Sequence, residues 1–177
     1  SAAALIALGC DDIYMHPDAK IGDIGVIARQ GPNAEFQFIP EKLLTVLKED
    51  AKDLARKKNR PEALALAMII KETEVYQVKH RDTGRVWYMT EDEIHAKGDE
   101  WIKGAIVPET RNNQFLTVSG QRAHELLIAE APVADRDELR ERLSIPPGTS
   151  LDAVARTWVD SLVFVLNQRG IKILLIV

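Results

Sequence analysis

The chain begins with a short apolar run of small residues. Ser1 precedes the run Ala2–Leu8, and Gly9 follows it. A hydroxyl residue, then strong helix formers, then glycine is the pattern of an N-cap, a helix and a stop. We therefore predict a helix with Ser1 at its N-terminus, where free backbone N–H groups and the helix dipole favour an oxyanion.

Two extended segments follow this helix. Residues 12–17 and 19–27 are predicted as strands, joined at Pro17, and Gly22 and Gly25 interrupt the second one. The pattern then becomes helical. Leu43, Leu47, Ala51 and Leu54 form one apolar stripe of a helix over 41–58, and Pro61 opens a second helix that reaches Ile70.

Alternation of polar and apolar residues returns between 74 and 89. The turn residues 82–84 lie in its middle, so we predict a β-hairpin. Thr90 then caps a short helix, with Glu93 in the capping-box position. The aromatic side chains of Trp87 and Trp101 could form a lid or a partner surface, although packing inside the hairpin is the commoner outcome.

The last third of the chain is predicted to be mainly helical. Residues 135–143 have the pattern of a short amphipathic helix, and residues 144–150 form a linker rich in turn residues. The final stretch, 158–177, has polar interruptions that keep it below the roughly 18 apolar residues of a membrane span. An ordinary helix is the expectation there, and the residues shown contain no signal peptide.

The pattern around the first helix resembles a known family. The segment SAAALIALGCDDIYMHPDAKIGDIGVI is similar to the nucleophile region of the NfeD-type membrane serine proteases of the ClpP/crotonase superfamily, which are related to signal peptide peptidase SppA. Ser1 falls on the family's nucleophile. Met15-His16-Pro17 and Ile21-Gly22 fall on the strand and turn that follow it.

The resemblance continues along most of the chain. Residues 51–60 look like the stretch that carries the family's general-base lysine, which places that lysine at Lys52. Residues 115–126 are similar to the family's leucine-threonine strand and the helix after it, and 157–162 resemble the linker before its membrane region. Residues 72–113 depart from the shorter family pattern as an insertion, which we expect to project from the body as a hairpin.

This resemblance implies an α/β, ClpP/crotonase-like spiral fold, present in part. Residues 1–145 would form the C-terminal part of the protease domain, and 146–177 a linker and the start of a membrane-proximal segment. The implied activity is that of a membrane-bound serine endopeptidase with a Ser1/Lys52 dyad. Ala2 N–H is the oxyanion-hole donor that this chain can supply. We expect the chain to be a fragment, with the rest of the oxyanion hole upstream.

The dyad is chemically reasonable because a serine hydroxyl needs a base, and a lysine can serve when it is neutral. Burial can lower a lysine pKa by about 3 to 5 units. Periodicity alone does not select the base. Lys52 projects off the centre of the apolar stripe, and Lys48, one turn earlier, fits equally well. The resemblance selects Lys52.

Composition excludes several other classes of protein. The net charge is −4 with both signs interspersed, so we expect no nucleic-acid partner. The basic stretch 52–60 is interpreted as a solvated helix end. The four histidines are scattered and lack metal-ligand spacing, so neither a metal nor a cofactor is expected. Cys10 is the single cysteine, which rules out an internal disulfide, and its apolar surroundings suggest a core position.

By family resemblance, the substrates would be hydrophobic peptides or membrane-protein segments, with stomatin-type partners and self-association. The location would be the cell membrane, with the protease domain outside the cytoplasm. A catalytically inactive membrane scaffold of the same fold is the alternative. An N-terminal-nucleophile hydrolase that uses the amine of Ser1 begins on a strand, which the helical run after Ser1 disfavours. Crotonase-type acyl-CoA chemistry lacks an assignable acidic residue.

Overall fold

A computed structural model describes residues 2–25, 27–28, 37–38, 41–146 and 149. It divides into two units, one up to Leu139 and one from Arg140, and each is described by itself. The first unit contains all described strands and all described helices except the end of the last one. The helices are α1 (Ala2–Gly9), α2 (Glu41–Lys57), α3 (Glu62–Ala67), α4 (Glu91–Lys97), α5 (Gly120–Glu125) and α6 (Arg136–Arg142), with 3₁₀ turns η1 (Gly98–Glu100) and η2 (Pro108–Thr110).

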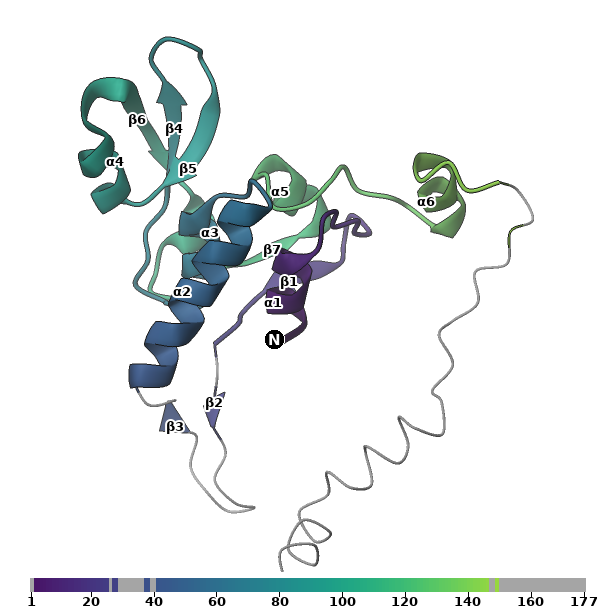
Figure 1. The fold of residues 1–177 in the computed structure, drawn as a ribbon, viewed down its shortest axis with the longest axis horizontal. Helices are drawn as coiled ribbons and strands as arrows, with labels where there is room; N and C mark the ends of the chain where they lie inside the picture. Colours follow the sequence, from purple (N-terminus) through teal and green to yellow (C-terminus); the bar gives the residue numbers. More distant parts are fainter. Residues whose placement is uncertain (1, 26, 29–36, 39–40, 147–148, 150–177) are drawn as a thin grey trace, which may run out of the picture. The chain divides into compact units, whose positions relative to one another are not determined.

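The described strands form three separate antiparallel groups (Figure 1). In the first, Ile21 of β1 lies opposite Val118 of β7. The second is a two-residue pair, β2 with β3. The third is a three-stranded sheet in the order β5-β4-β6, with a bulge between Tyr76 and Val78. The strand bounds are β1 (Lys20–Gly22), β2 (Ile27–Ala28), β3 (Gln37–Phe38), β4 (Tyr76–His80), β5 (Val86–Met89), β6 (Trp101–Ile106) and β7 (Thr117–Ser119).

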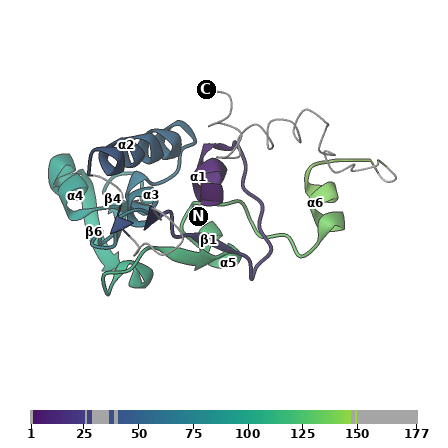
Figure 2. The same ribbon diagram turned by 90° about the horizontal axis from the view of Figure 1, so that it is seen from below.

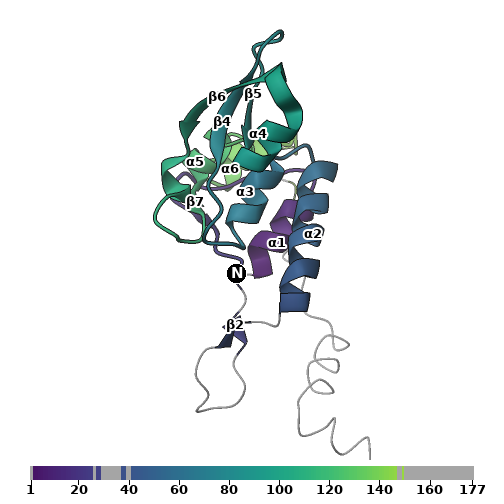
Figure 3. The same cartoon turned by 90° about the vertical axis from the view of Figure 1, so that its left-hand side faces the viewer.

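We call α1, α2, α3, α5 and the β1/β7 pair the helical body. Helices α1 and α2 lie side by side, and α3 packs against α2 (Figures 2 and 3). Small residues allow the close approach, because Ala51 and Ala55 of α2 are completely buried. The fully buried larger side chains come from segments far apart in the sequence: Leu8, Leu64, Met68, Val75, Leu116, Leu126 and Ile128.

We call the three-stranded sheet with α4 the hairpin sheet. It has its own small cluster, in which Val78, Met89 and Ile94 are buried. Yet Val75, Tyr88 and Val107 belong to the core of the helical body, and the Tyr88 hydroxyl donates a hydrogen bond to Glu125 O at 3.0 Å. The expected insertion over 72–113 therefore contributes side chains to the main core.

Most of the predicted elements are confirmed. The first helix, the long helix from residue 41, the hairpin, the capping box of Thr90 with Glu93 and the short helix near 135–143 all form. The second segment of 19–27 is divided at Asp23–Gly25, as its glycines predicted, and Gly22 has φ +136°. Strand β6 was not predicted.

The strand predicted over 12–17 is wrong. This segment is irregular, although Ile13 O and Met15 O each accept a backbone hydrogen bond, from Glu130 and Val133, at 2.9 Å. Two isolated backbone hydrogen bonds are too few to form the continuous hydrogen-bond pattern of a β-strand. Pro61 also differs from the prediction, because it occupies the N-cap of α3 rather than its first helical position.

Three helices end in the same way without glycine. Asn59, Leu127 and Ser144 each adopt positive φ after a helix, at 52°, 60° and 54°. The next amide in each case donates to the carbonyl five residues earlier, at 2.8 to 2.9 Å, as in a Schellman motif. The linker from 146 and the segment 158–177 lie almost entirely outside the described residues. None of the helices in the described part of the chain is long and apolar enough to cross a membrane.

Candidate active site

The first helix begins at Ala2, directly after the candidate nucleophile. Ser1 itself lies outside the described residues. Ala2 is in the first turn of α1, whose N–H groups have no acceptor within the helix, so its backbone can donate to an oxyanion at this end. The helix is short, with eight residues.

A hollow of about 290 Å³ lies beside α1. It brings together the three parts of the sequence that carry the family resemblance: the alanine helix, the segment that contains Met15, and the Ile21-Gly22 turn. Its lining is mainly apolar and consists of Ala3, Ala4, Ala7, Ile13, Tyr14, Met15, Lys20, Ile21 and Gly22. Such a surface can accept an apolar side chain next to the start of the helix.

The turn at Gly22 depends on glycine. A Cβ atom there would lie 2.1 Å from Leu116 O, because β1 and β7 approach closely at this point. Asp23 N donates to that same carbonyl at 3.0 Å, and Ile24 N donates to Met68 O at 2.8 Å. These contacts hold the Ile-Gly turn against the body and shape one wall of the hollow.

Lys52 is on α2, as predicted, but it contacts a different hollow. Its Nζ lies 3.6 Å from a carboxylate oxygen of Glu49, and about a third of its side chain is exposed. The hollow that it lines includes Leu66 and Ile70 of the α3 region and carboxylates near α4, with no residue of α1. Lys48 is half-buried. For Lys52 to act as a base, its ion pair with Glu49 would have to open.

Arg60 is the polar residue that sequence reasoning missed. The stretch 52–60 was interpreted as solvated, and for Arg60 this is wrong, because only 6% of it is exposed. Its guanidinium donates to four backbone carbonyls: Leu8 O at 3.0 Å, Cys10 O at 2.8 Å, Asp11 O at 3.0 Å and Ile128 O at 2.9 Å. Three of these acceptors lie at the C-terminal end of α1, where a cation suits the helix dipole.

Burial changes the pKa of Arg60. Loss of solvent lowers the pKa of the Arg60 guanidinium from its ordinary value, while acidic residues such as Glu130 and Asp12 act in the opposite direction. The four carbonyl acceptors replace the lost water. Hydrophobic periodicity could not predict that Arg60 is buried, because Arg60 follows the end of α2 and periodicity describes only residues within a helix.

The remaining chemically active side chains make local contacts. Cys10 is exposed, so the core position expected for it is wrong, and its Sγ lies 3.5 Å from Ile6 O. Nδ1 of His16 accepts from Asp18 N, and Nδ1 of His80 accepts from Asp82 N and Thr83 N. No cluster of metal-ligating side chains occurs among the residues that the structure describes.

Comparisons with known proteins give structural matches alone. No protein-family model matches the chain, and no curated protein does. It is similar to a lysine-to-alanine mutant of the 1510-N membrane-bound stomatin-specific protease in complex with a substrate peptide, with 17% identity and a TM-score of 0.54 over 95% of this chain and 64% of that one. The serine-to-alanine mutant matches with 18% identity and a TM-score of 0.50, over 80% and 48%.

These matches show the fold. The chain spans between about half and two thirds of the matched protease chains. The predicted resemblance to NfeD-type membrane proteases is thus confirmed at the level of the fold.

Proposed function

We propose that this chain is part of a membrane-bound serine endopeptidase that cleaves hydrophobic peptide or membrane-protein segments through an acyl-enzyme. The observation that supports it most is the hollow beside α1, which is lined by all three segments that resemble the family: α1, the segment around Met15 and the Ile21-Gly22 turn. The shared fold with a stomatin-specific protease supports it as well. Ser1 is the proposed nucleophile, and Ala2 N–H contributes to the oxyanion hole.

The proposed general base is Lys52, which the resemblance assigns. Before Lys52 could act as a base, its ion pair with Glu49 would have to open and its ammonium group would have to lose a proton. Lys48, one turn earlier on α2 and half-buried, is the alternative base.

Further parts of the proposal come from the resemblance and from the neighbours' names. The matched protease is called membrane-bound and stomatin-specific, and one of its structures contains a substrate peptide. We propose a peptide substrate, a stomatin-type partner, self-association, and a membrane location with the protease domain outside the cytoplasm.

Cleavage of a hydrophobic peptide by the full-length protein tests the proposal. Ser1→Ala should abolish turnover, because no other group replaces the nucleophile. Lys52→Ala should abolish turnover as well, whereas Lys48→Ala, one turn earlier on the same helix, should leave most of it. The Ser1 variant combined with the inactive lysine variant should be hardly worse than either alone, since the two residues act as one unit.

No cleavage by the wild-type protein would support the inactive scaffold instead, and full cleavage by Ser1→Ala would exclude Ser1 as the nucleophile.

A further inference from the structure

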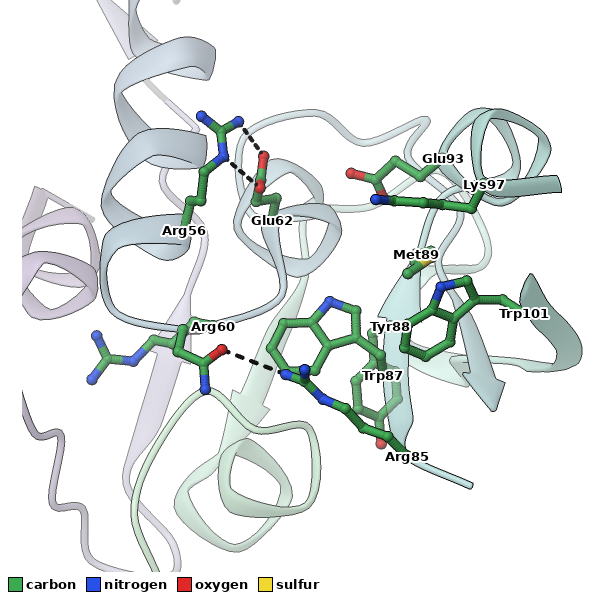
Figure 4. Close-up of a pocket in the computed structure, with 11 residues that line it drawn as sticks. Arg56, Arg60, Glu62, Arg85, Trp87, Tyr88, Met89, Glu93, Lys97 and Trp101 are labelled. Atoms are coloured by element: carbon green, nitrogen blue, oxygen red, sulfur yellow. Dashed lines mark hydrogen bonds and ion pairs between the residues drawn. The ribbon is translucent and has the colours of Figure 1, made fainter. Parts of the chain in front are cut away.

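A third hollow, of about 310 Å³, lies between the hairpin sheet, including its helix α4, and the turn that joins α2 to α3 (Figure 4). Trp87, Met89 and Trp101 form its apolar wall. None of its lining residues lines the hollow beside α1. The proposed protease activity therefore leaves this hollow without a role.

The register of the sheet places the two tryptophans on one face. Trp87 of β5 lies opposite Val78, and Trp101 of β6 lies opposite His80, two positions further along β4. The Trp101 ring packs edge-on against His80 with 5.0 Å between ring centroids. Both tryptophans pack on the cluster of the hairpin sheet and remain half-buried, so part of each side chain stays available to a ligand.

Charged side chains surround this aromatic wall, and several of them have hydrogen-bond partners within the chain. Arg56 donates to both carboxylate oxygens of Glu62, at 2.8 and 2.7 Å. Glu93 accepts from Thr90 N at 2.8 Å and shares the α4 side of the hollow with Lys97 (Figure 4). The Arg60 guanidinium points away from the hollow, toward its carbonyl acceptors (Figure 4).

Arg85 lies at the edge of the aromatic wall. Its guanidinium lies 4.4 Å from the centroid of the Trp87 ring and donates to Asn59 Oδ1 at 3.4 Å. Within the described residues no acidic side chain pairs with it. Arg56 also donates to a carboxylate oxygen of Asp53, at 2.9 Å, so its charge is offset within the chain. The charge of Arg85 remains available to a ligand at the edge of the aromatic wall.

We propose that this hollow binds an acidic peptide segment. An aromatic or aliphatic side chain of the segment would pack on Trp87 and Trp101, and an adjacent carboxylate would pair with Arg85. A guanidinium matches a carboxylate with two parallel hydrogen bonds, and the Trp87 ring already holds it in place. The volume is at the lower end of ligand pockets, so one side chain fills it better than a large cofactor. Tryptophan and arginine are also the residues that dominate binding energy at interfaces.

Fluorescence anisotropy with short labelled peptides tests this directly. The probe is fluorescein-labelled Gly-Glu-Phe-Glu-Gly, and the comparison peptides replace both glutamates with lysine or the phenylalanine with serine. We expect the acidic aromatic peptide to bind about tenfold more tightly than either one. Its affinity should fall as salt is added, because the ion pair is partly exposed.

Two variants locate the binding. Arg85→Gln should weaken the acidic aromatic peptide about tenfold and leave the lysine peptide unchanged. Lys79→Gln is the matched control, since Lys79 is an exposed cation on the other face of the same sheet. Trp87→Phe should keep the fold and weaken the same peptide by a smaller factor, and a urea unfolding curve for each variant checks its stability.

The proposal is overturned if the wild-type chain binds none of the peptides, if acidic and basic peptides bind equally, or if Arg85→Gln has no effect. Equal binding of the serine peptide would reduce the site to an anion contact and would also overturn it. Because no cleavage is measured, failure here is distinguishable from failure of the proposed protease function.

Discussion

The helical body and the hairpin sheet are stabilised in different ways. In the body, contacts between residues far apart in the sequence dominate. Arg60 joins residues 8–11 to Ile128 through buried hydrogen bonds, and completely buried alanines bring α1 and α2 together. In the hairpin sheet, contacts are mostly local: neighbouring strands pair, a capping box starts α4, a small cluster around Val78 is buried, and ion pairs such as Lys103 with Glu91 are exposed.

This difference teaches where substitutions should be most damaging. A buried polar group with all its partners is costly to disturb, because each acceptor left without a donor loses its hydrogen bond without regaining water. Exposed ion pairs contribute little, typically up to about 1 kcal/mol. The body should therefore respond strongly to single changes, whereas the hairpin sheet should tolerate them.

The largest effect is expected for Arg60→Met. This change leaves four backbone carbonyls without their donor, so it should lower the free energy of unfolding by about 3–5 kcal/mol. Urea denaturation followed by circular dichroism measures it. Arg56→Met, on the exposed side of the same stretch, is the control and should cost about 1 kcal/mol or less. Equal losses in both variants would show that Arg60 is an ordinary surface cation.

The second comparison uses two glycines with positive φ. In the body, Gly22→Ala places a Cβ atom 2.1 Å from Leu116 O, a backbone atom that cannot move alone. We expect a loss of about 2–4 kcal/mol from strain and displacement of β7. In the hairpin sheet, Gly98 has φ +58° and ψ −136° and no atom within 4 Å of the added Cβ, so Gly98→Ala meets backbone strain alone and should cost about 1–2 kcal/mol. Similar melting temperatures for the two variants would contradict the close approach at Gly22.

The third prediction concerns pH at the junction of the two regions. Arg122 of α5 donates to Glu109 Oε1 at 2.7 Å and to Glu125 Oε2 at 2.8 Å. Burial is the largest single influence and raises the pKa of Glu109, but the hydrogen bond from Arg122, a backbone hydrogen bond and the positive charge of Arg122 together outweigh it, so the net pKa is lowered from 4.5. The pKa of Glu125 is lowered from 4.5 as well, mainly by its hydrogen bond from Arg122.

A carboxyl group with a lowered pKa in the folded state stabilises above its unfolded pKa, and that stability is lost as pH falls through the folded pKa. We therefore expect the free energy of unfolding to decrease below pH 4.5, the ordinary value for these groups. Glu109→Gln should cost about 1–2 kcal/mol at neutral pH and flatten this acid-side decrease. Unfolding curves measured across the acid range check it. An unchanged slope in the variant would show that Glu109 does not contribute.

The smallest expected effect is a stabilisation. Leu127 ends α5 with φ +60° and is 41% exposed, so its side chain gains little from burial while its backbone is strained. Leu127→Gly should raise the free energy of unfolding by about 0.5–1 kcal/mol. Leu143 is an exposed leucine without positive φ, so Leu143→Gly should not stabilise. A lower melting temperature for Leu127→Gly would mean that its side-chain contacts outweigh the strain.

The local sequence is enough to specify most of the helices, the cap of α4 and the hairpin. A cap, a run of helix formers and a glycine stop are enough for α1, and a stripe at helical spacing is enough for α2. Thr90 with Glu93 specifies the start of α4, and alternation around a turn specifies β4 and β5. These features depend on hydrogen bonds and side-chain positions within a few residues, so their causes can be read along the chain. The family resemblance extended this to the fold.

Tertiary structure alone decided the contacts between distant segments. The sequence placed Arg60 in solvent, and only packing brings residues 8–11 and 128 around its guanidinium. Residues 12–17 look like a strand, yet a strand needs a partner ladder, and only the fold determines whether one is present. Periodicity alone made Lys48 and Lys52 equally good candidates for the general base. Packing places Lys52 beside the carboxylate of Glu49 and in a hollow that contains no residue of α1. In each case a local pattern determines the backbone of one segment, while burial and pairing depend on which other segments the fold places beside it.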